Sequence, residues 1–199
     1  MKINILKNIN SNFGDKLQNV CYAESGQQLK VNLIKEDGTL IIAGTLNGIF
    51  LVDKDSDSIQ FLTNFDRAFA HRITIEGGWS NKEVTDDGNW TGGKQDIGEC
   101  VGTTWGVTAP EVSKYLGRAA TIQDMQKLSQ DTAAIIFKAN YWDKFKGDRI
   151  NDYGICQDLL DATINQGLGT GIKEIQEAAG LPVTEKMDDT TIAHLNNQA

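Results

Sequence analysis

The sequence has too few cysteines and histidines for a disulfide framework or a metal centre. Its 199 residues include three cysteines, Cys21, Cys100 and Cys156, an odd number at wide spacings that indicates reduced thiols. The two histidines, His71 and His194, lie too far apart in the chain for a zinc-ligand pattern. A phosphate-binding glycine loop is also missing. We therefore expect neither a metal nor another cofactor.

Long apolar runs and an excess of positive charge are missing as well. No apolar run approaches the roughly 18 residues that cross a bilayer, so we expect no membrane insertion. The formal net charge of −8 argues against binding to the phosphate backbone of a nucleic acid. The N-terminal segment MKINILKNINSNFGDKL lacks the apolar centre and cleavage site of a secretory signal. We therefore expect a protein made in the cytoplasm without a signal peptide.

The chain has two regions of different pattern. Residues 1–62 alternate apolar and polar side chains over short segments between polar turns, which predicts a small antiparallel β module of three to five strands. From Thr63 onward the apolar spacing is helical. The fold class is therefore α+β, with a β-rich accessory module at 1–62 followed by a mainly α-helical domain at 63–199.

Start and stop signals divide the second region into helices and one long loop. Capping residues and apolar spacing predict helices beginning at Thr63, Thr108, Thr121 and Ser129, and further helices over 153–166, 171–179 and 189–197. Residues 79–107 are rich in Gly, Asp, Asn and Thr and have little periodicity. A loop of this length inside a compact domain is usually functional, so we expect the site there.

Glu76 ends the first predicted helix, directly before Gly77, Gly78 and Trp79. A carboxylate in this position can sit in a cleft, and the glycines let a polymeric ligand approach the backbone closely. This arrangement suits a general acid that cleaves a glycosidic bond. Taken alone, a glutamate at a helix end is more often solvated, so the interpretation depends on the rest of the chain.

Three further stretches supply that context. They run over Asp86–Gly93, Gly102–Thr108 and Asp161–Gly167, and Tyr141 with Trp142 precedes the last of them. Tryptophans can stack on sugar faces, while Asp, Asn and Thr side chains can bind hydroxyl and acetamido groups. Together these residue types indicate an extended glycan ligand.

With these motifs the chain resembles glycoside hydrolase family 108, the N-acetylmuramidases that cut peptidoglycan. The Glu-Gly-Gly-aromatic pattern falls at 76–79, the Asn-Trp-Thr-Gly-Gly loop within 86–93, and the Thr-x-x-Gly-Val-Thr run at 103–108. Residues 141–199 resemble the peptidoglycan-binding region that follows in the family. Asp87 stands where that family commonly has proline, and Thr184–Asp188 replaces its usual glycine turn.

The resemblance implies a lysozyme-like fold with Glu76 as the catalytic acid. It also implies hydrolysis of the β-1,4 bond between N-acetylmuramic acid and N-acetylglucosamine. A second carboxylate is less defined: Asp86 can act as a base or stabilise positive charge, or it can simply cap the loop as an Asx-turn. Asp87 and Glu99 are weaker candidates for the same role.

The predicted substrate-binding residues come from the loop and from the later motifs. For Thr103, a capping role is an equal alternative to substrate binding. Tyr141 can instead pack in the core, and Asn165 can instead form a supporting network with Asp161, one helical turn away. The candidates are Trp79, Asn89, Thr103, Trp105, Tyr141 and Asn165.

The predicted partner is the glycan strand of peptidoglycan, and residues 1–62 can dock to a protein partner. We expect a phage endolysin, a virion lysin or a bacterial lytic enzyme that reaches the cell wall after release or as part of a virion. Two alternatives remain open at the level of sequence. One is a non-catalytic peptidoglycan-binding module, against which the retained Glu76 argues, and the other is a lytic transglycosylase, because one glutamate can serve both chemistries.

Overall fold

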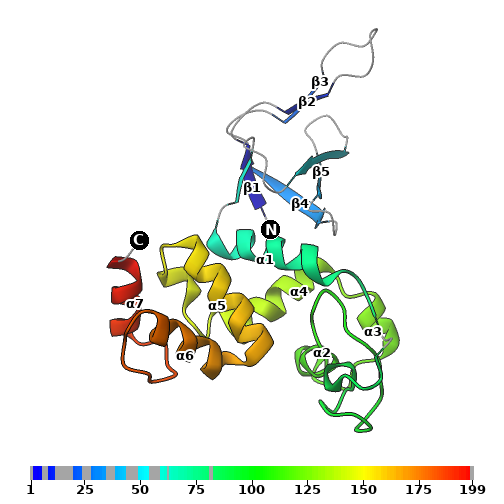
Figure 1. The fold of residues 1–199 in the computed structure, drawn as a ribbon. Helices are drawn as coiled ribbons and strands as arrows, with labels where there is room; N and C mark the ends of the chain where they lie inside the picture. The colour runs from blue at the N-terminus through cyan, green and yellow to red at the C-terminus, as the bar shows by residue number, and fades with distance from the viewer. Residues whose placement is uncertain are drawn as a thin grey trace. The chain divides into compact units, whose positions relative to one another are not determined.

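The computed structural model describes the backbone of residues 2–5, 9–11, 20–23, 28–34, 39–43, 49–53, 59–61, 63–80 and 83–197 (Figure 1). It describes the side chains of residues 63–74, 77–80 and 83–197. The chain divides into two compact units, Met1–Ile75 and Glu76–Ala199. This division assigns the first helix to the first unit, whereas the sequence-based boundary at residue 62 assigns it to the second.

The first unit contains short antiparallel strands and one helix. Five strands pair in the order β6-β5-β4-β1-β7, and β2 pairs with β3. The predicted role of residues 1–62 as an accessory module stays a prediction. The strands are β1 (Lys2–Ile5), β2 (Ile9–Ser11), β3 (Val20–Ala23), β4 (Gln28–Ile34), β5 (Thr39–Ala43), β6 (Ile49–Asp53) and β7 (Ile59–Phe61), and the helix is α1 (Asn64–Glu76).

The second unit is helical, which confirms the predicted mainly α-helical character of this part of the chain. Short single-turn segments lie between the longer helices. The elements are η2 (Asp87–Asn89), α2 (Ala109–Leu116), α3 (Ile122–Gln126), α4 (Gln130–Phe137), the π-helical η3 (Lys138–Trp142), η4 (Gly147–Arg149), α5 (Tyr153–Gln166), α6 (Leu168–Ala178) and α7 (Asp189–Asn197).

Polar side chains begin these helices at the residues that the sequence indicates. The hydroxyl of Thr121 accepts a hydrogen bond from the backbone N–H of Asp124 at 3.2 Å, and the hydroxyl of Ser129 accepts one from Thr132 at 3.1 Å. Each bond satisfies a donor that would otherwise lack an intrahelical partner. Gly117 ends α2 in the left-handed conformation, with φ of 69°, which glycine adopts without steric cost.

The core of the second unit is centred on Trp142. Its side chain is fully buried, it contacts Phe145 edge-on with ring centroids 5.3 Å apart, and its indole N–H donates to Asp148 Oδ1 at 2.7 Å. A Cβ atom on Gly147 would lie 2.4 Å from the indole ring, so only glycine allows this close approach. The tight packing fixes η3 and therefore the position of Tyr141 beside Trp142.

Candidate active site

Glu76 is the last residue of α1, where the sequence predicts it. The helix begins at Thr63, whose hydroxyl accepts a hydrogen bond from the backbone N–H of Asp66 at 3.0 Å. Phe65, Phe69 and Ile73 on the predicted apolar face are buried. The side chain of Glu76 lies outside the described residues. Its catalytic role therefore stays a prediction, and the neighbouring backbone defines the site.

The chain turns sharply directly after Glu76. Gly77 has a φ of 66°, a conformation in which a side chain would be strained. Its carbonyl oxygen accepts a hydrogen bond from the backbone N–H of Trp105 at 3.2 Å. The Glu76–Trp79 motif is thus tied to the middle of the Gly102–Thr108 run, although the two are far apart in sequence.

The next residues form a short antiparallel bridge with the same run. Ser80 donates to the carbonyl of Thr103 at 2.9 Å, and Thr103 donates back at 2.7 Å. The indole N–H of Trp79 donates to the carbonyl of Val101 at 3.0 Å. Because the N–H of Trp79 is engaged in this way, the half-buried ring can offer only its faces and edges to a ligand.

The Asp86–Gly93 loop folds around a buried asparagine. Asn89 donates from its side chain to the carbonyl of Glu83 at 2.6 Å, and its own backbone carbonyl accepts from Val101 at 2.9 Å and Gly102 at 3.2 Å. Asp86 lies on the surface and accepts a hydrogen bond from the backbone N–H of Gly88 at 2.8 Å, which is the predicted Asx-turn. That contact occupies Oδ1 and leaves the charged group exposed.

Trp105 joins the loop to the helices that follow. It has a φ of 55°, which is uncommon for an aromatic residue and often marks a functional or strained position. Its indole N–H donates to the carbonyl of Leu128 at 2.8 Å, and the hydroxyl of the preceding Thr104 donates to the carbonyl of Met125 at 2.7 Å. The loop is therefore anchored to the end of α3 and to the turn between α3 and α4.

Glu111 is a residue of the site that the sequence analysis used only as a helix-start signal. Its Oε2 accepts hydrogen bonds from the backbone N–H of Thr108 at 3.0 Å and from the Thr108 hydroxyl at 2.9 Å. Its Oε1 accepts bonds from Asn140 at 3.2 Å and from the Tyr141 hydroxyl at 2.8 Å. The Thr-x-x-Glu spacing indicated the first pair, but nothing in the sequence indicated the second.

The structure brings most of the predicted substrate-binding residues into one hydrogen-bonded assembly. The bridges at 77–80 and 100–107 hold Trp79, Asn89, Thr103 and Trp105, and Glu111 links Tyr141 to the end of the same run. Asn165 is exposed on α5, with Asp161 half-buried one turn before it. A substrate contact by any of these residues stays a prediction.

Among the side chains of residues 63–74, 77–80 and 83–197, no three His, Cys, Asp or Glu come together in a way that could hold a metal ion. None of the helices in the described part of the chain is long and apolar enough to cross a bilayer.

Comparison with known proteins adds to this geometry. Residues 69–167 match the family described as Glycosyl hydrolase 108. The solved structure titled "Structure of Brucella abortus SagA" is similar to the chain with a TM-score of 0.53 and 26% sequence identity, over 68% of this chain and 70% of that one. A search of the curated proteins found no match.

Proposed function

We propose that this chain, which belongs to the glycosyl hydrolase 108 family and is a glycoside hydrolase, is a lysozyme-like enzyme that cleaves peptidoglycan. The bond cut is the β-1,4 link between N-acetylmuramic acid and N-acetylglucosamine, and Glu76 is the general acid. The observation that carries the proposal is the family match over 69–167, because that segment contains Glu76 and the loop motifs in their expected order.

Glu76 protonates the glycosidic oxygen as the bond to the leaving sugar breaks, while positive charge develops on the sugar that stays behind. The backbone supports this role because Gly77, the next residue, is fixed by the N–H of Trp105. A fixed backbone keeps a proton donor in one position relative to the reacting bond. Such positioning accounts for much of the rate enhancement of an enzyme over the reaction in solution. Trp79 and Trp105 offer ring faces to the sugars.

Asp86 is the proposed second carboxylate. It is exposed, and its carboxylate caps the turn through a single backbone hydrogen bond to Gly88. The remaining lone pairs can orient a water molecule or stabilise the oxocarbenium-like transition state. A retaining mechanism needs the two carboxyl groups about 5 Å apart, and an inverting one needs about 6.5–9.5 Å.

The same proposal covers the cellular setting. The enzyme acts at the bacterial cell wall after release or as part of a virion, and residues 1–62 dock to a protein partner. A pull-down from the producing cells or virions with the full chain and with a chain lacking residues 1–62 tests that docking.

The first prediction concerns Glu76→Gln. An amide cannot donate the proton at the needed acidity, so lysis of purified cell walls should fall by at least two orders of magnitude. The control is Glu83→Gln, which removes an exposed carboxylate of the same loop. Initial lysis rates measure the effect. Near wild-type lysis by the Glu76→Gln protein would refute the assignment, while retained cell-wall binding by that protein is expected.

A further inference from the structure

A groove on the second unit lies outside the residues assigned to catalysis. It has a volume of about 420 Å³, within the size range of ligand sites in proteins. Its walls come from the second half of α2, the turn after it, α3 and the start of α4. The lining residues are Val112, Tyr115, Leu116, Arg118, Thr121, Gln123, Asp124, Lys127, Leu128, Ser129 and Thr132.

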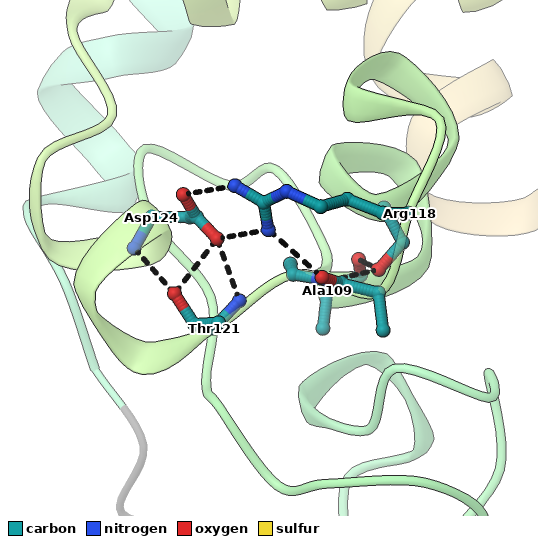
Figure 2. Close-up of polar contacts among 7 residues, drawn as sticks. Ala109, Arg118, Thr121 and Asp124 are labelled. Atoms are coloured by element: carbon teal, nitrogen blue, oxygen red, sulfur yellow. Dashed lines mark hydrogen bonds and ion pairs between the residues drawn. The ribbon is translucent and has the colours of Figure 1, made fainter.

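One wall of the groove is held by an ion pair that forms two hydrogen bonds. Arg118 donates to the two carboxylate oxygens of Asp124 at 2.7 and 2.9 Å, as Figure 2 shows, and the N–H and hydroxyl of Thr121 donate to the same carboxylate. These bonds, first of all those from Arg118, hold the pKa of Asp124 far below its usual range. The wall is thus charge-balanced and stays formed without a ligand.

The rest of the groove combines apolar and polar surface with one positive charge. Tyr115 and Leu116, which both line the groove, are exposed by 49% and 38% and supply its apolar surface. Lys127 also lines the groove, and none of the described acidic groups pairs with it. A ligand that fits this lining has small apolar groups and at least one carboxylate.

Trp105 links the backbone of the groove to the backbone of the proposed active site. Trp105 donates from its backbone to the carbonyl of Gly77, the neighbour of Glu76, and from its indole to the carbonyl of Leu128, which lines the groove. Thr104 is tied to Met125 in the same way. The turn after Glu76 and the groove-lining Leu128 are therefore separated by a single tryptophan residue.

We propose that the groove binds the stem peptide of peptidoglycan, so that the enzyme recognises peptide-bearing N-acetylmuramic acid. The inference rests on the proposed function, because in peptidoglycan the glycan strand bound along the loop presents the stem peptide to the groove. Stem peptides have alanine methyl groups, which fit the surface of Tyr115 and Leu116. They also have free carboxylates, which can form an ion pair with the ammonium group of Lys127.

Two substitutions test the groove, Tyr115→Ala and Lys127→Met, with Lys114→Met as the matched control. Lys114 is exposed on α2 and does not line the groove. Initial rates are measured on two substrates, peptidoglycan strands that keep their stem peptides and the same strands stripped of peptide. We expect both groove variants to raise KM about five-fold or more for the peptide-bearing strands only, with kcat unchanged, since the contact is made equally in the ground and transition states.

An equal rise in KM on both substrates, or an unchanged KM in both groove variants, would overturn the proposal. Isothermal titration calorimetry with the free stem tetrapeptide tests the groove independently of the proposed function, because peptide binding needs no hydrolysis. If the wild-type chain cuts neither substrate, the proposed function is refuted. The peptide-binding role of the groove is then tested by tetrapeptide binding alone. Tetrapeptide binding that is weaker in both groove variants but unchanged in the Lys114→Met protein supports the peptide-binding role of the groove. Absence of tetrapeptide binding to the wild-type chain refutes that role.

Discussion

The polar atoms of the predicted sugar-binding residues are largely engaged in holding the loop together. The indole N–H groups of Trp79 and Trp105 and the side-chain amide of Asn89 all donate to backbone carbonyls. A buried carbonyl that loses its donor costs about 1–3 kcal/mol. These residues are therefore needed for the fold of the loop even where they also touch a ligand, and a test of binding has to separate the two roles.

Trp105 allows that separation. Trp105→Phe keeps an aromatic face but leaves the carbonyl of Leu128 without its donor, so we expect a loss of about 1–2 kcal/mol in the free energy of unfolding and a small change in KM. Trp105→Ala removes the ring as well and should raise KM several-fold further. Denaturant unfolding and steady-state kinetics measure the two effects. Equal KM values for the two variants would show that the ring face does not bind substrate.

Asp86 has a comparable pair of substitutions. Asparagine also caps a turn, so Asp86→Asn keeps the bond to Gly88 while removing the charge, and we expect a lower kcat with an unchanged Tm. Asp86→Ala removes both the charge and the cap, and it should also lower Tm. An Asp86→Asn protein with wild-type kcat would make Asp86 a turn residue only.

At the scale of secondary structure, the C-terminal segment depends on one buried glutamine. The side-chain amide of Gln176 on α6 donates to the hydroxyls of Thr184 and Thr191 and to the carbonyl of Lys186, at 2.9–3.0 Å. Its carbonyl oxygen accepts from the backbone N–H groups of Thr184 and Glu185. Gln176 thus fixes the 181–188 connection between α6 and α7.

Gln176→Ala should therefore destabilise the protein strongly. It removes a fully buried side chain and leaves the buried hydroxyl of Thr191 and the polar groups of residues 184–186 without these bonds, so we expect a loss of about 3 kcal/mol or more in the free energy of unfolding. The control is Gln126→Ala, an exposed glutamine on α3, which should change it by about 0.5 kcal/mol or less. Far-UV circular dichroism in a denaturant series measures both. A Gln176→Ala protein as stable as the control would contradict the role of this amide.

The sequence predicted the elements that depend on local chemistry. Helix starts at Thr108, Thr121 and Ser129 follow from the capping side chains, and all three helices begin where expected. One helix starts earlier than predicted, at Leu168 instead of residue 171. A Cβ on Gly171 would lie 2.8 Å from the backbone of Thr163, so this glycine serves the close contact of α5 and α6 inside the helix and does not mark its start.

Contacts between segments that are distant in the chain could not be predicted from the sequence. Glu111 accepts hydrogen bonds from Asn140 and Tyr141, which follow it by about thirty residues, and no local spacing encodes such a contact. The same holds for the groove beside α2, which forms only when α3 and α4 pack next to that helix. The loop at 79–107 was predicted as a unit, but its bridges depend on pairing between residues such as Ser80 and Thr103.

At the scale of the whole molecule, acid should destabilise the protein. The pKa values of Asp124 and Asp189 are lowered, first of all by hydrogen bonds from Arg118 and Arg149, and the pKa of Asp188 is lowered by the backbone of Thr191. A carboxylate with a lowered pKa in the folded state stabilises it above its unfolded pKa of about 4, and this stability is lost as the pH falls further. Asp66 acts in the opposite sense, because burial raises its pKa.

Among the described carboxyl groups more have a lowered pKa than a raised one, so Tm should be lower at pH 3 than at pH 6. Asp124→Asn removes one of the titrating groups and should make the difference between the two Tm values smaller. Asp158→Asn is the control, because Asp158 is exposed on α5 and forms no ion pair with the described residues. A difference in Tm that is the same for Asp124→Asn and wild type would contradict the assignment.

The measurement that tests the central claim most directly is mass spectrometry of the products released from purified peptidoglycan, with the wild-type and Glu76→Gln proteins side by side. The account predicts fragments from the wild-type protein that end in reducing N-acetylmuramic acid, and almost none from the variant. Anhydro-muropeptides would identify a lytic transglycosylase. Intact glycan strands after incubation with the wild-type protein, or equal release by the two proteins, would contradict a muramidase that acts through Glu76.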